Sequence, residues 1–318
     1  MKAFKWRSLL QSSCFRWCTG SRPNIRFLVI NSLQAIKAFS LCVIAIFLSA
    51  CDQSSAKLFV ANGLAQLSDY RLQSNIAYGE LSQQQLDIYQ PVLGVDNKQA
   101  TVVFFYGGCW GHCTEFTKAD YRFVAEALVA EGYTVVVPDY RLFPAVKFAE
   151  IIDDARLAVE WTRDKATASN QRLFLMGHSA GGHLAAMLTV DERYLSQASR
   201  DQLAGFIGLA GPYDFLPFTK PYQQVLFAPE SFYPDSQPVN FIEGTEPPML
   251  LLYGLDDSTV KPRNHQQLAA RVTALNGRVV VREYQGLDHS GLVGALSKPM
   301  RKNLTVHTDI LKFLNANR

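Results

Sequence analysis

The stretch that decides the fold is LFLMGHSAGGHLAAML, residues 173–188. Its first four residues are apolar and predict a buried strand, and residues 183–188 predict a helix. Gly177, Gly181 and Gly182 lie between the two, so the chain can turn sharply from the strand into the helix. A strand that passes into a helix is the unit from which parallel α/β sheets are built.

The same alternation continues on both sides of this stretch. Short apolar runs bounded by Gly or Pro predict strands buried on both faces of a parallel sheet. The segments between them repeat apolar residues at helical spacing. We therefore predict an α/β fold: a mostly parallel, doubly wound sheet, helices on both faces, and an antiparallel edge near Ile76 and residues 86–89. The expected strands are residues 101–106, 134–137, 172–176, 206–209, 249–253 and 278–283, and the expected helices are residues 120–131, 148–166, 181–188, 264–275 and 303–314.

The turn at residues 177–181 matches Gly-x-Ser-x-Gly, the nucleophile elbow, in the strand–turn–helix context that this motif requires. Ser179 is the predicted nucleophile. The N–H of Ala180 would lie at a helix amino terminus, where backbone donors and the helix dipole favour a developing oxyanion. A tight turn without chemistry is the alternative interpretation.

A second glycine loop, Tyr106-Gly-Gly-Cys-Trp110, follows the expected strand 101–106. It occupies the place of the esterase loop that contributes an N–H to an oxyanion hole, with Tyr106 where His is common. Gly107, Gly108 and Cys109 are therefore the candidate oxyanion-hole residues of this loop, together with Ala180. A structural turn after a strand is the alternative.

The candidate acid and base follow the last two strands. Asp256 and Asp257 stand in a loop after the strand 249–253, and we choose Asp257 because related hydrolases place the acid three residues after the glycine, here Gly254. His289 stands in a glycine-flanked loop after the final strand. The chain order Ser179, Asp257, His289 is the order that the nucleophile-elbow fold requires.

The other histidines are expected to have structural roles. We expect His178 to shape the turn and His183 to be fixed within its helix, whereas His112 near the second glycine loop could touch substrate. His265 and His307 fall in amphipathic helices, where they are expected to be solvated or packed. No metal-binding motif is present, so we expect no metal and no cofactor.

The charge distribution argues against a nucleic-acid partner. The formal net charge is +3, from 31 basic and 28 acidic residues, but residues 1–50 contain seven basic and no acidic residues. Removing those seven leaves 24 basic against 28 acidic residues. The rest of the chain therefore has no basic excess with which to bind phosphate backbones, and we expect a small-molecule acyl substrate instead.

The amino terminus predicts export. Basic residues precede an apolar run at residues 38–50, which is too short for a bilayer span of about 20 residues and fits a signal peptide. The run ends in Leu-Ser-Ala-Cys51, which resembles the lipobox of bacterial lipoproteins, and this resemblance implies lipidation of Cys51. In such lipoproteins an Asp after the cysteine, here Asp52, often accompanies retention at the inner membrane, so the implied location is its periplasmic face. The alternatives are an uncleaved membrane anchor, or a segment that is neither a lipoprotein signal nor an anchor.

These features divide the chain into a signal peptide at residues 1–50, a tether with a lead-in helix or loop at residues 51–74, and a catalytic domain at residues 75–318. Only Cys109 and Cys113 lie in the domain. Their spacing permits a disulfide in an oxidising compartment, and two unpaired thiols are equally compatible with the sequence.

From Thr101 to His289 the chain resembles the esterase and lipase branch of the α/β hydrolases, near the hormone-sensitive-lipase type and the kynurenine formamidases. The likeness rests on YGGCW at 106–110, PDYRLFP at 138–144, GHSAGGHLAAML at 177–188, and the Asp257 and His289 loops. It implies the α/β-hydrolase fold and cleavage of carboxylic esters through an acyl-enzyme on Ser179.

An aromatic-rich excursion at residues 212–247 could be a small cap over the acyl site or part of the core. A small cap would favour short-chain or small aryl and alkyl esters. Two other functions stay open: an amidohydrolase of the arylformamidase type, and a non-catalytic binding module on a hydrolase scaffold.

Overall fold

The structure is a computed structural model that describes residues 53–168 and 171–318. The predicted signal peptide at residues 1–50 and the predicted lipidation site Cys51 lie outside the described residues. Within the described part of the chain, no helix is long and apolar enough to cross a membrane.

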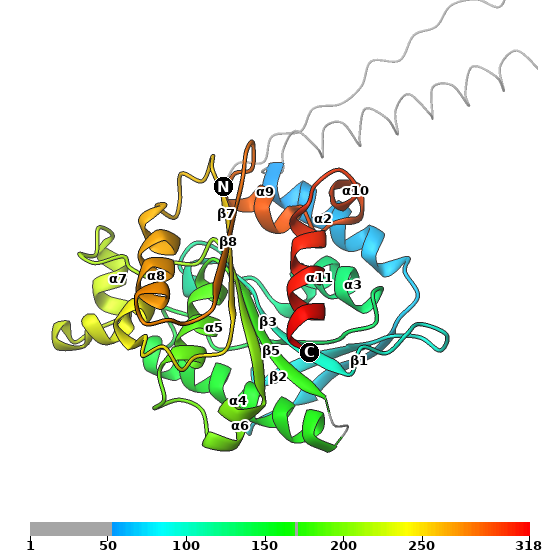
Figure 1. The fold of residues 1–318 in the computed structure, drawn as a ribbon, viewed down its shortest axis with the longest axis horizontal. Helices are drawn as coiled ribbons and strands as arrows, with labels where there is room; N and C mark the ends of the chain where they lie inside the picture. The colour runs from blue at the N-terminus through cyan, green and yellow to red at the C-terminus, as the bar shows by residue number, and fades with distance from the viewer. Residues whose placement is uncertain (1–52, 169–170) are drawn as a thin grey trace, which may run out of the picture. The chain divides into compact units, whose positions relative to one another are not determined.

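A sheet organises this part of the chain, and eight strands of the described residues belong to it (Figure 1). The strand order is β1-β2-β4-β3-β5-β6-β7-β8. Strand β2 pairs antiparallel with β1 and β4, and all other neighbours are parallel. The predicted α/β class and the antiparallel edge are therefore confirmed. The strands are β1 (Arg71–Ala77), β2 (Gln85–Gln90), β3 (Ala100–Phe105), β4 (Thr134–Pro138), β5 (Arg172–His178), β6 (Leu203–Leu209), β7 (Met249–Gly254) and β8 (Val279–Tyr284).

Helices cover both faces of the sheet, as the apolar strands predict. Every residue of β3, β4, β6 and β7 is buried, because helices pack on both sides of these strands. Figure 1 shows α4 (Phe148–Ala168), α5 (Ala180–Val190) and α8 (Arg263–Ala274) on one face, and α3 (Arg122–Val129) and α11 (Val306–Asn317) on the other. Every residue of α5 is buried, which places the helix of the elbow at the centre of the domain.

The order of the strands fixes where a ligand site can lie. From β3 the sheet continues to β4 on one side, and from β5 it continues through β6, β7 and β8 on the other side. At such a reversal the loops after neighbouring parallel strands separate and leave a crevice at their carboxyl ends. The two glycine loops singled out in the sequence follow β3 and β5, so both lie at this crevice.

The segment predicted as a tether is partly built into the domain. Helix α2 (Gln53–Gln66) and the start of β1 fall within residues 51–74, and Ala61 and Ala65 of α2 are buried. The folded domain thus begins well before residue 75. The buried face of α2 consists of two alanines and its outer face is also apolar, so helical periodicity does not reveal it.

Candidate active site

Ser179 lies in the sharp turn between β5 and α5. Its backbone has φ 55° and ψ −123°, a conformation that non-glycine residues rarely adopt. The turn is tight because its glycines leave no room for a side chain: a Cβ on Gly181 would lie 2.1 Å from the carbonyl oxygen of Phe105. The predicted elbow therefore forms, and it lifts Ser179 to the end of the sheet while the side chain remains largely buried, 8% exposed.

Three loops bring Ser179, His289 and Asp257 together. His289 begins the short helix α9 (His289–Gly294), and its Nε2 lies 2.8 Å from the Oγ of Ser179. Its Nδ1 lies 2.7 Å from Oδ2 of Asp257. The three residues are 110 and 32 positions apart in the chain, so only the parallel sheet brings their loops to one place.

The carboxylate of Asp257 is buried and fully hydrogen-bonded. Its side chain has no solvent exposure, and its Oδ1 accepts hydrogen bonds from the backbone N–H groups of Thr259 (2.7 Å) and Val260 (2.9 Å). Burial by itself would raise the pKa of Asp257, but the hydrogen bonds and the positive charge of His289 outweigh burial and lower the pKa. Asp256, the competing carboxylate of the sequence, is exposed, so the geometry favours Asp257.

The ionised carboxylate determines which nitrogen of His289 carries the proton. A carboxylate only accepts hydrogen bonds, so Nδ1 of His289 must be the donor toward Asp257. In the neutral ring the proton on Nδ1 leaves Nε2 as the acceptor that faces the Ser179 hydroxyl. This is the arrangement that a general base needs before it removes the serine proton.

His178 contacts the backbone of the base His289, and the sequence did not reveal this contact. Its Nε2 donates to the carbonyl oxygen of His289 over 3.0 Å, and the two rings lie 4.8 Å apart. Burial, followed by the positive charge of His289, lowers the pKa of His178 to about 3, so His178 stays neutral at physiological pH. His178 was expected to shape the turn, and in the structure it also holds the backbone of the neighbouring loop.

The loop after β3 adopts an unusual backbone. Four consecutive residues, Gly108 to Gly111, have positive φ, and two of them are Cys109 and Trp110. A disulfide joins Cys109 to Cys113 with a Cα–Cα distance of 5.3 Å, which decides between the two possibilities that the sequence left open. The carbonyl oxygen of Gly108 accepts hydrogen bonds from the amides of Gly111, Cys113 and Thr114, so the loop folds around that one oxygen.

This loop directly contacts the elbow. A Cβ on Gly107 would lie 3.1 Å from the Cβ of Ser179, so a side chain at this position would push its neighbours apart by a few tenths of an ångström. The amide of Gly108 has no acceptor among the described residues. Gly107, Gly108 and Cys109, with Ala180 at the start of α5, therefore remain the candidate oxyanion-hole residues.

Tyr106, which occupies a position where histidine is common, is part of the framework. Its ring is 1% exposed and stacks on Tyr140 at 4.7 Å, and its hydroxyl donates to Oδ1 of Asp139 over 3.0 Å. Lys118 donates to the same carboxylate. This partly buried network holds the end of β3 in place.

The aromatic excursion packs against the site. Trp110 of the oxyanion loop contacts Phe215 and Phe227, and the buried ring of His183 contacts the same two residues. The Nε2 of His183 lies 2.7 Å from the carbonyl oxygen of Ser236, which ties α5 to the excursion and confirms a structural role for His183.

Several aromatic residues of the excursion thus belong to the core, as Phe218 and Phe227 are buried. At its outer edge Tyr222 stacks on the exposed ring of His112 at 3.9 Å. His112 therefore contacts the excursion from the oxyanion loop. The excursion combines the two roles that the sequence left open, since it fills the core and also borders the loop beside Ser179.

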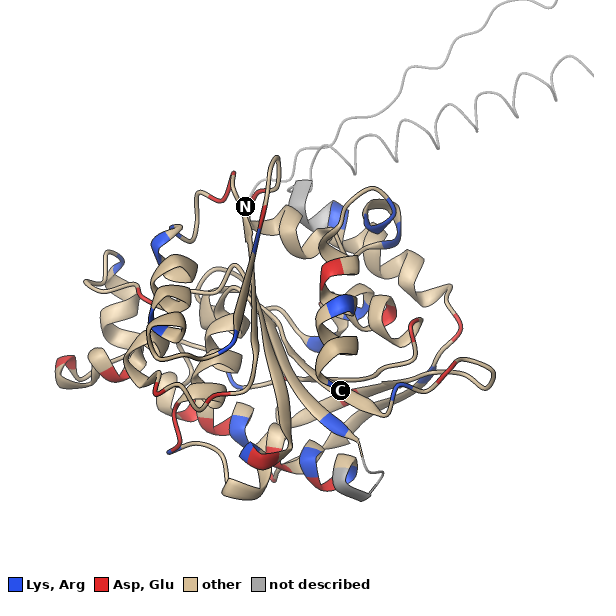
Figure 2. Ribbon diagram, viewed as in Figure 1, with Lys and Arg blue, Asp and Glu red and all other residues tan. Residues whose placement is uncertain are grey.

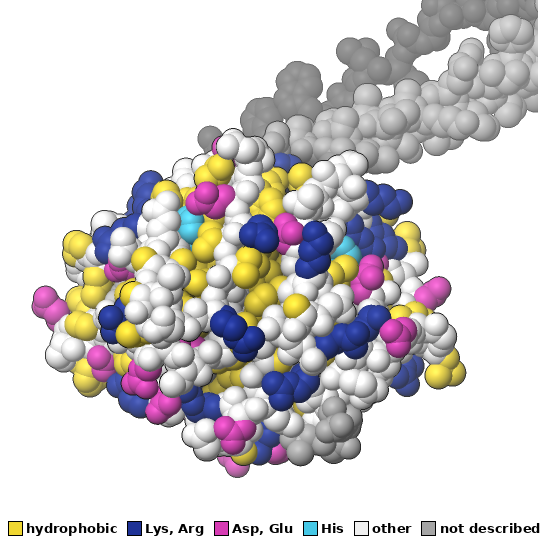
Figure 3. Space-filling model, in the orientation of Figure 1, with side chains coloured by type: hydrophobic (Ala, Val, Ile, Leu, Met, Phe, Trp, Pro, Cys, Tyr) yellow, Lys and Arg dark blue, Asp and Glu magenta, His cyan; other side chains and the backbone are white. Residues whose placement is uncertain are grey.

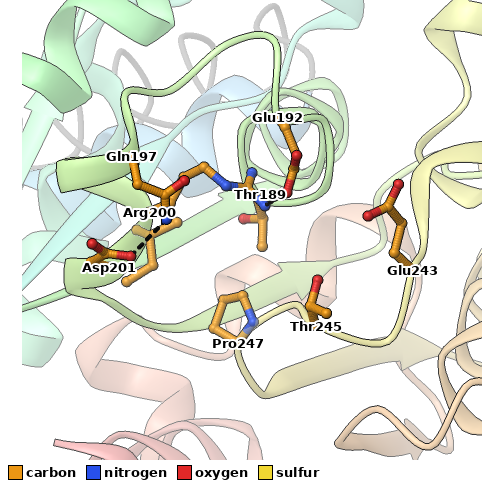
Figure 4. A pocket seen from close by; sticks show the side chains of 9 residues that line it. Thr189, Glu192, Gln197, Arg200, Asp201, Glu243, Thr245 and Pro247 are labelled. Atoms are coloured by element: carbon orange, nitrogen blue, oxygen red, sulfur yellow. Dashed lines mark hydrogen bonds and ion pairs between the residues drawn. The ribbon is translucent and has the colours of Figure 1, made fainter.

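Two surface pockets lie away from the triad. A polar pocket of about 330 Å³ is lined by Thr189, Arg200 and Glu243 among others, near the amino ends of β6 and β7 (Figure 4). A groove of about 550 Å³ lies between β8 and α11, where Figure 3 shows hydrophobic side chains in a hollow. Both are at the opposite edge of the sheet from Ser179, because parallel strands end where Ser179 lies and begin at these pockets.

Comparisons with known proteins identify the family of the chain. The family model BD-FAE matches residues 86–272, more than half of the chain. The chain belongs to the BD-FAE family. Its similarity to a carbohydrate esterase from gut microbiota, with a TM-score of 0.65 and 18% identity over 78% of this chain and 96% of that one, shows the α/β-hydrolase fold.

Two curated relatives are similar in sequence. Esterase LipC of Mycobacterium tuberculosis is 26% identical over 76% of this chain and 64% of its own length. A kynurenine formamidase of Salmo salar is 30% identical over 51% of each chain. The BD-FAE chain thus spans between about half and two thirds of the length of these relatives. The expected resemblance to the esterase and lipase branch is confirmed.

Proposed function

We propose that this BD-FAE protein is a serine hydrolase that cleaves carboxylic esters, with Ser179 as nucleophile, His289 as general base and Asp257 as the residue that orients the base. The observation that carries the proposal is the continuous chain of hydrogen bonds Ser179–His289–Asp257, with distances of 2.8 and 2.7 Å. Its similarity to esterase LipC supports the same chemistry.

In the first half of the reaction, Nε2 of His289 takes the proton of Ser179 as Oγ attacks the acyl carbonyl. The carbonyl oxygen becomes an oxyanion, which accepts hydrogen bonds from the amides of Gly108, Cys109 and Ala180. The ionised carboxylate of Asp257 stabilises the imidazolium that forms. The C–O bond to the alcohol then breaks, and the alcohol leaves with the proton from His289.

In the second half, a water molecule attacks the acyl-enzyme on Ser179. His289 takes a proton from the water and returns it to Oγ as the carboxylic acid leaves. Each oxyanion donor is expected to contribute about 3–4 kcal/mol to transition-state stabilisation, because such donors are fixed before the charge develops. The steps need no cofactor, since the three side chains and the backbone amides supply every proton transfer and charge contact.

Short-chain or small aryl and alkyl esters are the proposed substrates. The ring of Trp110 in the oxyanion loop packs against Phe215 and Phe227 of the excursion, and these two rings also contact each other. The contacts hold the excursion close to the oxyanion loop. An aromatic wall of this kind favours small apolar groups over long acyl chains.

Hydrolysis of an aryl formamide is a second candidate. The 30% identity with a kynurenine formamidase favours it, although that likeness covers about half of each chain. The same triad would attack the formyl carbonyl, with an amine as the leaving group.

We also propose that the domain is held at the periplasmic face of a bacterial inner membrane by lipidation of Cys51. The Cys109–Cys113 disulfide supports export, because disulfides persist in oxidising compartments. Replacement of Cys51 by Ala should release the protein from membranes, and attachment that persists in this variant would indicate an uncleaved anchor.

Labelling with a fluorophosphonate probe tests the catalytic proposal. The wild type should be labelled and the Ser179→Ala variant should not, with kcat at least about 10⁴-fold lower because the nucleophile is gone. Wild-type protein that is folded but never labelled would favour a binding module. A comparison of p-nitrophenyl acetate with N-formylkynurenine as substrates would then separate the esterase from the formamidase.

A further inference from the structure

Helix α2 exposes apolar side chains on its outer face. Phe59 is 80% exposed, Val60 is 50% exposed, and Leu67, one residue beyond the helix, is 79% exposed. At 100° per residue, positions 59, 60 and 67 fall on one side of the helix, opposite Ala61 and Ala65, which are buried in the domain. The helix is thus apolar on both faces, whereas a helix on a water-facing surface has a polar outer face.

The orientation of α2 is fixed by hydrogen bonds to the domain. The side chain of Asn62 donates to the carbonyl oxygen of Asp120 over 2.7 Å and accepts from the amide of Phe123 over 3.2 Å. The hydroxyl of Ser68 donates to Glu126 over 2.7 Å. The helix therefore cannot rotate to bury Phe59 without breaking these contacts.

Basic residues lie beside this apolar face. Arg301, at the end of α10 (Lys298–Arg301), bonds the same Glu126 carboxylate as Ser68, which brings α10 next to the end of α2. Residues 53–68 and 289–308 contain no Asp or Glu. Figure 2 shows the basic residues of α10 near α2. Lys57 and Lys302 are exposed, so their charges face outward with the apolar side chains.

The sequence that precedes α2 identifies what can cover this face. The apolar run ends at residue 50 and α2 begins at Gln53, three residues later. Cys51, the proposed lipidation site, precedes Gln53 by two residues, which span at most about 7 Å, so a membrane that holds the lipid must lie close to the start of α2. Exposed apolar side chains flanked by lysines are the features of a helix that lies in the interface of an anionic bilayer.

We propose that α2 and α10 form a membrane-docking surface. Phe59, Val60 and Leu67 enter the boundary between head groups and acyl chains, and Lys57 and Lys302 pair with anionic lipid head groups. The surface binds lipid in addition to the proposed anchor at Cys51, and it is independent of ester hydrolysis. It would fix the orientation of the catalytic domain on the bilayer, which a lipid anchor alone does not do.

Photo-cross-linking of the protein expressed in bacteria from its full coding sequence and purified from their membranes tests this surface. p-Benzoylphenylalanine is placed at position 59 or, as the matched control, at Phe232, which is 58% exposed on the aromatic excursion. The protein is reconstituted in vesicles of phosphatidylethanolamine and phosphatidylglycerol, irradiated, and digested for mass spectrometry. Lipid adducts at position 59 and none at position 232 are the expected result.

Every other product overturns the proposal. An adduct from position 59 to residues 1–50 would show that the chain covers its own helix, and an adduct to a second protein molecule would identify an interface between copies. Protein that floats with the vesicles but yields no adduct would show that the anchor holds it while α2 stays in water. Failure to float would refute the anchor and the docking surface together.

A charge reversal sharpens the test. Lys57→Glu with Lys302→Glu should reduce the lipid adduct at position 59 by at least about fivefold, since a basic residue near an anionic surface changes binding by about that factor. The control pair Lys220→Glu and Lys261→Glu, two exposed lysines elsewhere on the domain, should leave the adduct unchanged. Equal adducts in both pairs would refute the electrostatic part of the surface. Unchanged midpoints of thermal unfolding would confirm that all variants are folded.

Discussion

The two sides of the candidate site are held in place by different means. On the triad side, Ser179 is 8% exposed, the carboxylate of Asp257 is fully buried, and hydrogen bonds among three strand ends fix every group. On the oxyanion side, Cys109 is only partly buried and Cys113 is exposed, and a covalent bond closes the loop. Buried hydrogen bonds secure the first side, and a disulfide secures the second.

The difference follows from where each side lies. A buried carboxylate must have hydrogen-bond partners, and the amides of Thr259 and Val260 supply them without any covalent link. The oxyanion loop instead holds two non-glycine residues at positive φ, Cys109 and Trp110, and each of them costs of order 1 kcal/mol or more. We therefore expect kcat to fall when the triad loses a hydrogen-bonding side chain, and also when the disulfide of the oxyanion loop is reduced.

The largest effect should come from the triad side. Asp257→Asn should lower kcat by about 10⁴-fold, because an amide that donates toward Nδ1 stabilises the wrong tautomer of His289. Steady-state kinetics on p-nitrophenyl acetate would measure this loss. Circular dichroism would show whether the fold is retained.

The neighbouring Asp256 provides the matched control. Its side chain is exposed, and Asp256→Asn should change kcat less than about threefold, as expected for a surface position. If Asp256→Asn produced the large loss and Asp257→Asn did not, the carboxylate assignment would be wrong.

The sequence was sufficient to predict the sheet, the order of the triad and the two glycine loops. These features depend on apolar runs, turn glycines and strand order, which are local or follow from the rules of parallel sheets. Gly181 illustrates why: only glycine fits 2.1 Å from the carbonyl oxygen of Phe105, so the motif itself reports the close approach.

Contacts between distant loops could not be predicted in this way. His178 hydrogen-bonds the carbonyl oxygen of a residue 111 positions away, and no pattern in the sequence marks that contact. The buried face of α2 consists of Ala61 and Ala65 in a helix that is apolar on both sides, so periodicity gave no signal there. The disulfide could not be predicted because the Cα–Cα distance between Cys109 and Cys113 is known only from the folded loop.

Reduction of the Cys109–Cys113 bond should have the next largest effect. Freed from the bond, the loop should leave its positive-φ conformation and withdraw the amide of Cys109 from the oxyanion, which lowers kcat by about 10²-fold, the cost of one oxyanion donor. The free energy of unfolding should fall by only about 2 kcal/mol, because the bond closes a short loop. The measurement is kcat before and after treatment with dithiothreitol, alongside a titration of free thiols.

The double variant Cys109→Ser, Cys113→Ser is the control for this experiment. It should have the low kcat of the reduced enzyme and should not respond to dithiothreitol. Wild-type enzyme with two titratable thiols and an undiminished kcat would show that packing, not the disulfide, holds the oxyanion loop.

The smallest expected effect is on the pH dependence of the free energy of unfolding, through the neutral, buried residues His178 and His183. Burial lowers the pKa of His178 to about 3 and that of His183 to about 4, whereas a histidine in the unfolded chain titrates near 6.5. Below pH 6.5 the unfolded chain therefore binds protons that the folded chain does not. The free energy of unfolding should fall by about 2 kcal/mol for each of these histidines between pH 7.5 and pH 5, and it should continue to fall toward pH 4.

Urea unfolding of wild type and His183→Gln at several pH values would measure this contribution. Glutamine can still donate to the carbonyl oxygen of Ser236, which His183 contacts at 2.7 Å, but it does not titrate. The variant should therefore lose about 2 kcal/mol less than the wild type between pH 7.5 and pH 5. His265 and His307, whose pKa values are also lowered by burial, add the same background slope to both proteins. Identical slopes in the two proteins would mean that His183 already gains a proton in the folded state, and the packing of α5 against the excursion would then be looser than the buried ring implies.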